Sequence, residues 1–126
     1  MQGYVNPRYE ARLTVQIADA HNHLHEFEAV IDTGFNGAIT LPSKIIHRLG
    51  LPWQTRGRAA MANGQVDYFD SYSGWAQWGD EKRPILIESA ETIPLVGMRL
   101  LRGYRVCIEA ERNGLVTLEA IGKSIP

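Results

Sequence analysis

Short runs of alternating apolar and polar residues, separated by turn-forming segments, constrain the fold of this chain most. In the run LTVQI, residues 13–17, every second side chain is apolar, and a similar alternation occupies FEAVI, residues 27–31. A period of two is typical of strands with one buried face. The polar run ADAHNH, residues 18–23, lies between them. The two runs are therefore predicted to pair as a hairpin.

Turn signals predict two more hairpins and a further turn farther along the chain. The pair Asn63-Gly64 stands between strand-like runs, and Asn-Gly strongly favours a tight turn. The segment WGDEKRP, residues 78–84, is a second turn signal. In the last third, residues 102–110 and 115–121 flank Asn113-Gly114. The chain is predicted to be mostly strand and turn.

One segment reads as a helix. In LPSKIIHRLGLP, residues 41–52, Ser43 is placed to cap the first turn, Gly50 to take the left-handed position after the helix, and Pro52 to prevent its continuation. The chain has 126 residues, of which 44% are hydrophobic, enough for one core. We therefore expect a single all-β domain, residues 1–126, with one or two short helices.

Charge and hydropathy argue against two classes of partner. The formal net charge is -1 and the lysines and arginines are scattered, so no basic face for nucleic acid is expected. No apolar run approaches the roughly 20 residues that cross a bilayer, and residues 1–7 lack the blocks of a signal peptide. We expect no membrane partner and a cytoplasmic location.

Few residues are candidates for metal or thiol chemistry. Cys107 is the only cysteine, which excludes an intrachain disulfide, and its neighbours Val106 and Ile108 predict that it is buried. His23 and His25 would share one face of a strand, either as ligands of a metal such as zinc or as a polar hairpin end. With no third ligand evident nearby, no metal and no cofactor are predicted.

An acidic residue interrupts an apolar stretch in AVIDTGFNGAITLP, residues 29–42. Asp32 follows three apolar residues, where burial penalises its charge unless hydrogen bonds or a second acid compensate. Asp-Thr-Gly occurs by chance in about a few per cent of chains this long, so a simple turn acid is the alternative. The residues on either side of the tripeptide are needed to distinguish a functional acid from a turn acid.

That surrounding sequence resembles the retropepsin-like aspartic proteases. Their pattern of two apolar residues, Asp-Thr-Gly and an apolar strand matches residues 30–34 and 38–41, and the Phe-Asn-Gly continuation is similar to small bacterial members. A second family motif, two apolar residues and a glycine that opens a short helix, matches Leu95, Val96 and Gly97. The resemblance covers about residues 9–121.

The resemblance implies catalysis by two carboxylates that share a proton, one acting as base toward water and the other as acid. This chain has one such motif, since Asp19, Asp67, Asp70 and Asp80 lack its flanking pattern. A homodimer with one Asp32 from each subunit is therefore implied.

Roles for the neighbouring residues also follow from the resemblance. The hydroxyl of Thr33 would cross to the other subunit's loop, and Gly34 would let a substrate backbone approach. A hairpin tip would close over an extended peptide or protein substrate that binds as an added strand. The implied substrate-binding residues, for which core packing is the alternative at the apolar positions, are Phe35, Asn36, Ile39, Ala62, Asn63, Gly64, Gln65, Val66, Ile93 and Leu95.

The chain departs from the family at one ion pair. In retroviral members, an acid shortly after the active-site glycine pairs with an arginine after the second-motif glycine, and these positions are Asn36 and Met98 here. Two functions remain open: a dimeric aspartic endopeptidase, and a non-catalytic dimer that binds peptides or proteins on the same fold.

Overall fold

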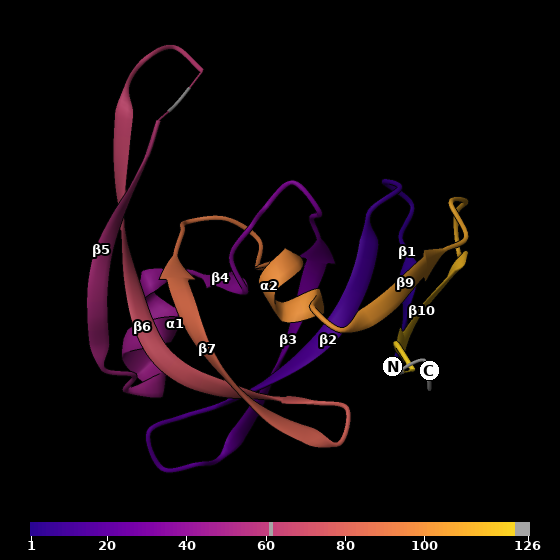
Figure 1. Ribbon diagram of the computed structural model, residues 1–126, viewed down its shortest axis with the longest axis horizontal. Coiled ribbons are helices and arrows are strands. Elements are labelled where there is room, and N and C mark those ends of the chain that lie inside the picture. Colours follow the sequence, from indigo (N-terminus) through magenta and orange to yellow (C-terminus); the bar gives the residue numbers. More distant parts are fainter. Residues whose placement is uncertain (61, 123–126) are drawn as a thin grey trace.

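The computed structural model describes residues 1–60 and 62–122, which form one sheet and two short helices (Figure 1). The helices are α1 (Ser43–Leu49) and α2 (Met98–Leu101). The strands are β1 (Gln2–Val5), β2 (Ala11–Ala18), β3 (Leu24–Ile31), β4 (Ile39–Leu41), β5 (Trp53–Ala60), β6 (Val66–Trp78), β7 (Glu81–Ser89), β8 (Leu95–Val96), β9 (Tyr104–Ile108) and β10 (Leu115–Ala120). The predicted all-β class is confirmed.

The three predicted hairpins are present, and the predicted turn within residues 78–84 connects a fourth. Antiparallel ladders join β2 to β3, β5 to β6, β6 to β7 and β9 to β10. Each of the four turns contains a residue with positive φ, namely Asn22 at 64°, Gly64 at 85°, Gly79 at 62° and Asn113 at 64°. Glycine and asparagine adopt this conformation at the lowest steric cost, which is why these turns were visible in the sequence.

The strand order is β5-β6-β7-β4-β8-β3-β2-β1-β10-β9, and β6 also pairs with β2. The long strand β6 makes this possible, because its far end reaches β2 at the pairs Gln16–Gln77 and Ile17–Ala76. The sheet consequently curls around the core. Leu13, Val15 and Ile17 point into it with exposed fractions of 2% or less, as their alternation predicted.

Helix α1 ends as predicted and begins differently. Gly50 takes the left-handed conformation at φ 72°, and Ile46 and Leu49 are buried. The prediction that Ser43 caps the helix is wrong, because Pro42 occupies the N-cap and no side chain caps it. Ser43 is the first helical residue, and its amide and hydroxyl both donate to Glu91 Oε1, at 2.9 and 2.8 Å.

The prediction that Cys107 is buried is also wrong, because its side chain is exposed. Strand β9 is the last strand of the sheet and, among the described strands, pairs only with β10. A strand at a sheet edge has solvent on one side and little covering its outer face, so even its apolar neighbour Ile108 is 42% exposed. No helix within the described residues is long and apolar enough to span a membrane.

Candidate active site

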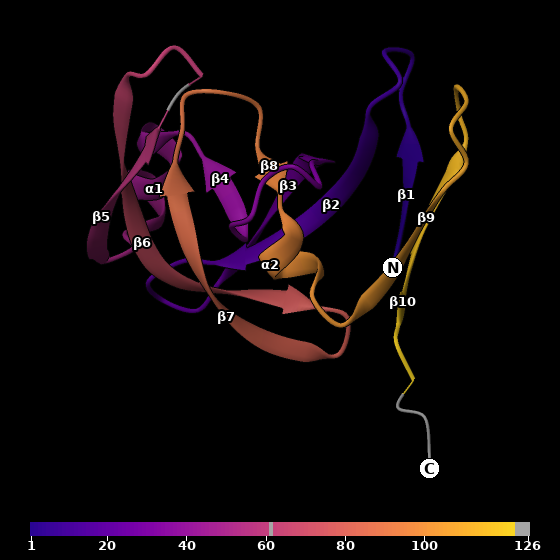
Figure 2. The same cartoon turned by 45° about the horizontal axis from the view of Figure 1, so that its top comes forward.

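Asp32 begins a loop that crosses the end of another strand. Strand β8 lies between β3 and β4, parallel to β3 and antiparallel to β4 (Figure 2). The chain therefore leaves β3 at Ile31, passes around β8 through residues 32–38, and returns as β4 on the other side. The two sequence motifs, 30–34 and 95–97, lie side by side because of this arrangement.

Backbone hydrogen bonds fix the start of the loop. The Asp32 amide donates to the Val96 carbonyl at 2.8 Å, and the Phe35 amide donates to the Asp32 carbonyl at 3.1 Å. The Asp32 carboxylate accepts the Gly34 amide at 2.9 Å through Oδ1. Its other oxygen, Oδ2, has no hydrogen bond within residues 1–60 and 62–122 and is free to act on a bound molecule.

The second motif holds the far side of the same loop. The Gly97 amide donates to Ala38 O at 2.9 Å, and the Met98 amide donates to Phe35 O at 2.8 Å. A Cβ atom at Gly97 would lie 2.6 Å from Phe35 O and 2.5 Å from the Phe35 ring. Only glycine allows this close approach, which gives the motif glycine a structural reason in this chain.

A buried hydroxyl, which the sequence analysis did not identify, links strand β4 to the start of strand β8. Thr40 Oγ1 accepts a hydrogen bond from the Leu95 amide at 2.9 Å, and Thr40 is only 5% exposed. This bond ties the start of β8 to β4. The sequence feature that could have indicated this bond is the threonine inside the apolar run AITL, because a buried polar side chain needs a hydrogen-bond partner.

The predicted catalytic residues differ in exposure. Asp32 is partly buried, whereas Thr33, Gly34 and Asn36 are exposed. The Thr33 hydroxyl makes no hydrogen bond to any other described residue. Met98 is 49% exposed, so the two positions at which retroviral members form an ion pair carry an exposed amide and an exposed thioether here.

The hairpin β5–β6 projects to the same end of the molecule as loop 32–38 (Figure 1). Its described tip residues Ala62, Asn63, Gly64 and Gln65 are exposed, and the Gln65 amide donates to Asn63 Oδ1 at 3.0 Å. Apart from the two neighbouring residues, no atom of residues 1–60 and 62–122 lies within 4 Å of a Cβ atom placed at Gly64. Residues 62–65 are therefore exposed, as residues of a closing element would be.

Asp70 fixes the middle of this hairpin. Its Oδ1 accepts hydrogen bonds from Trp53 Nε1 and Arg56 Nε, both at 3.1 Å. These bonds, the one from Trp53 most strongly, hold the pKa of the Asp70 carboxyl below its usual range. The aromatic residues Trp53 and Tyr68 are 57% and 64% exposed on the hairpin.

The apolar residues predicted to line a substrate pocket lie in different environments. Ile39 is fully buried in the core, opposite Val96 in the sheet. Leu95 is partly buried, Val66 is 45% exposed and Ile93 is 40% exposed. Phe35 packs its ring against Gly97 and Gly37, so its ring supports the loop.

The histidines near the β2–β3 turn form an acid–imidazole cluster. His25 Nε2 lies 2.8 Å from Asp19 Oδ2, and the amides of His21 and His23 donate to Asp19 Oδ1 at 2.8 and 3.0 Å. The His25 contact, then the backbone amides, hold the pKa of Asp19 well below its usual range. Across the described residues, no three His, Cys, Asp or Glu side chains are grouped to hold a metal ion.

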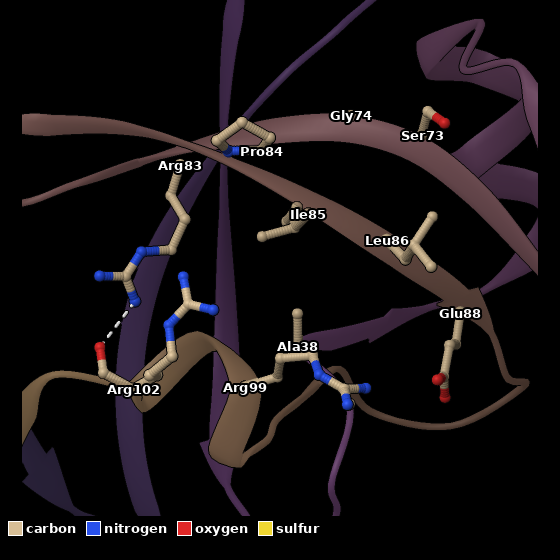
Figure 3. Close-up of a pocket in the computed structure, with 11 residues that line it drawn as sticks. Ala38, Ser73, Gly74, Arg83, Pro84, Ile85, Leu86, Glu88, Arg99 and Arg102 are labelled. Atoms are coloured by element: carbon tan, nitrogen blue, oxygen red, sulfur yellow. Dashed lines mark hydrogen bonds between the residues drawn. The ribbon is translucent and has the colours of Figure 1, made fainter.

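A cavity that the sequence did not indicate lies between hairpin β6–β7 and helix α2 (Figure 3). Its charged lining residues, Arg83, Glu88, Arg99 and Arg102, come from two segments that are adjacent only in the folded chain. No motif spacing connects them. Comparison with protein-family models, curated proteins and solved structures finds no match to this chain.

Proposed function

We propose that the protein is an aspartic endopeptidase of retropepsin-like barrel fold, active as a homodimer. The observation that carries the proposal is the placement of Asp32: a partly exposed carboxylate at the end of a strand, with one oxygen hydrogen-bonded to the loop backbone and the other without a hydrogen bond to any described residue. Several backbone hydrogen bonds and two closely packed glycines hold the loop. Such rigid placement is what a catalytic group requires.

The chemistry needs a second carboxylate, which a second copy of the chain supplies. The ionised Asp32 of one subunit takes a proton from water, and the water oxygen bonds to the scissile carbonyl carbon. The protonated Asp32 of the other subunit gives its proton to the carbonyl oxygen. The C–N bond of the tetrahedral intermediate then breaks. The first Asp32 gives its proton to the departing amine, and the second Asp32 takes a hydroxyl proton back from the intermediate, so the net reaction adds one water across the peptide bond and restores both carboxyl groups.

Two exposed elements support a dimer around this loop. Thr33 presents a hydroxyl with no hydrogen bond to any other described residue. It lies next to Asp32, whose carboxylate must approach the Asp32 carboxylate of the second subunit. Met98, which follows the second-motif glycine, is 49% exposed and offers an apolar contact where retroviral members use an ion pair. Hairpin β5–β6 extends to the same end and would cover an extended peptide.

The competing function is a dimer that binds peptides on the same fold and does not cleave them. Cleavage of a degenerate peptide library from pH 4 to pH 8, combined with sedimentation of the same samples, separates the two. We expect cleavage that rises with the dimer fraction and is abolished in Asp32→Asn. A stable dimer that binds peptides without cleaving them establishes the competing function, and cleavage that survives Asp32→Asn contradicts both the mechanism and the site.

The matched control is Asp80→Asn. Asp80 is an exposed acid in the β6–β7 turn, outside both motifs, so its replacement removes one carboxylate per chain without touching the loop. We expect this variant to retain wild-type cleavage.

A further inference from the structure

The cavity behind the Asp32 loop has the volume of a small-molecule site. It encloses about 420 Å³ between strands β6 and β7, helix α2 and the residues before β4. Ligand sites in proteins usually measure about 300–1,000 Å³. Gly37 and Ala38 line the cavity, but none of residues 32–36 does. The cavity is therefore separate from the carboxylate of the proposed active site.

One of its arginines is part of the framework. The Arg83 side chain is 10% exposed, and it pairs with Glu81. Its Nη1 donates to the carbonyls of Leu100 and Arg102, at 2.6 and 3.0 Å. These contacts hold the end of α2 against the β6–β7 hairpin and satisfy the Arg83 charge, so Arg83 shapes the cavity and is not available to a ligand.

The other two arginines are available. Arg99 and Arg102 are exposed, and neither guanidinium group lies within 4.0 Å of a carboxylate among the residues that the structure describes. Figure 3 shows both side chains extending along the cavity, with Arg99 directed toward Glu88 and Arg102 on the side of Arg83. Two cationic groups thus border one hollow without a carboxylate in ion-pair contact, and Glu88 is the acid that lines the same cavity.

Glu88 limits the charge that the cavity accepts. It is partly buried at the end opposite Arg102, and burial raises the pKa of its carboxyl while the positive charge of Arg99 opposes the rise. With Glu88 ionised, the two free guanidinium groups and this carboxylate leave a net charge of about +1. That charge favours a monoanion over a phosphate dianion.

Apart from Ser73, the uncharged side chains of the lining are apolar. Pro84, Ile85 and Leu86 form one wall, with Leu86 44% exposed, and Ala38 lies opposite (Figure 3). An apolar body would cover this wall and remove it from water. We propose that the cavity binds an amphipathic monocarboxylate, with its carboxylate attracted by the positive charges of Arg99 and Arg102 and its apolar body on the wall formed by Pro84, Ile85 and Leu86.

Binding there would contact the loop that carries Asp32. The Arg99 amide donates to the Gly37 carbonyl at 3.1 Å, and both residues line the cavity. A ligand held by Arg99 therefore lies against the closing end of loop 32–38. The site goes beyond the proposed peptidase, since its existence is tested by binding alone.

The test is a calorimetric titration of the full chain at pH 7 with N-acetyl-L-phenylalanine and with its C-terminal amide, which lacks the carboxylate. We expect saturable binding of the acid, and at least about tenfold weaker binding of the amide because charge-assisted hydrogen bonds are lost. Arg99→Gln combined with Arg102→Gln should weaken binding of the acid by a similar factor. Both side chains are exposed, so thermal unfolding of this double variant should match the wild type.

Arg105→Gln is the matched control, because Arg105 is exposed on β9 and does not line the cavity. It should leave binding unchanged. In a heteronuclear NMR titration, the amide signals of Gly37 and Gly74 should shift. Equal binding of acid and amide, equal binding by the double variant and the wild type, absence of saturable binding, or equal binding of inorganic phosphate would each overturn the proposal.

A third compound separates the two sources of such a carboxylate. 3-Phenylpropanoate carries the aromatic body and the carboxylate without a peptide group. Binding as tight as that of N-acetyl-L-phenylalanine assigns the site to free carboxylic acids, and weaker binding assigns it to the C-terminal residue of a peptide. Either result supports the carboxylate site.

Discussion

Gly97 and Gly37 lie so close together that a Cβ atom added at Gly97 would clash with the Gly37 carbonyl oxygen. The same Cβ atom would lie 2.6 Å from the Phe35 carbonyl oxygen. Both obstacles are backbone atoms of the loop that begins at Asp32. The second motif therefore acts as a close-fitting support for the first, and the position of Asp32 depends on it.

The first prediction concerns this contact. Gly97→Ala should lower the free energy of unfolding by about 1–3 kcal/mol, because the added methyl group must displace loop backbone. Urea unfolding measures this change. The rate of peptide cleavage should also fall under conditions in which the variant is still folded, because Asp32 moves with the loop. Gly122→Ala is the control, because, apart from the two neighbouring residues, no atom of the part of the chain that the structure describes lies within 4 Å of a Cβ atom there. Equal unfolding midpoints for the two variants would contradict the prediction.

The second prediction concerns the buried hydroxyl of Thr40. Thr40→Val keeps the side-chain shape and removes the acceptor of the Leu95 amide. A buried amide left without a partner should cost about 1–3 kcal/mol of unfolding free energy. Thr14→Val changes an exposed position of β2 and should stay within about 0.5 kcal/mol of the wild type. If both variants unfold at the same urea concentration, the Thr40 bond does not stabilise the β4–β8 pairing.

The local features of this fold were predictable, because short segments determine them. Asn63-Gly64 and Asn113-Gly114 gave the turns, the alternation around Val15 gave a buried strand face, and Gly50 gave the end of α1. Two local predictions failed for identifiable reasons. Pro42 displaced Ser43 from the cap, and the edge position of β9 left Cys107 exposed.

The non-local features were out of reach of pattern reasoning. Nothing in the sequence states that β8 inserts between β3 and β4, since strand order depends on pairings between distant segments. The cavity shows the same limit, because Glu88 and Arg99 approach each other only after β7 and α2 pack together. The sequence motif identified Asp32 as a candidate catalytic residue, whereas the hydrogen bonds that hold its loop could not be predicted from the sequence.

The third prediction is a pH dependence at Glu88. Its pKa is raised in the folded protein, so the stabilising form is the protonated one, and that contribution is lost as the pH rises through the folded pKa. Glu88→Gln should therefore be more stable than the wild type at pH 7, with the difference vanishing below about pH 4, where an unfolded-state glutamate is also protonated. Thermal unfolding across this range measures it. A variant less stable than the wild type at neutral pH would show that the Arg99 charge outweighs burial.

The fourth prediction is the opposite pH dependence at Asp19. Its pKa is lowered by His25 and by backbone amides, so its contribution to stability is present above the unfolded value and is lost as the pH falls through the folded pKa. The wild type should be more stable than Asp19→Asn at pH 7, and the difference in their free energies of unfolding should decrease below about pH 4. Urea midpoints at several pH values provide the test. A gap that stays constant down to strongly acidic pH would refute the role assigned to the Asp19–His25 contact.

The shared-carboxylate mechanism is tested most directly by mixing subunits. Wild type and Asp32→Asn are combined at equal concentration, unfolded and refolded together, and assayed for peptide cleavage at the same total protein concentration as the wild type alone. If each site needs one Asp32 from each subunit, only about a quarter of the dimers are active, and cleavage falls to about a quarter of the wild-type rate. A rate of about half would mean that each subunit acts on its own and would contradict the proposed dimeric site.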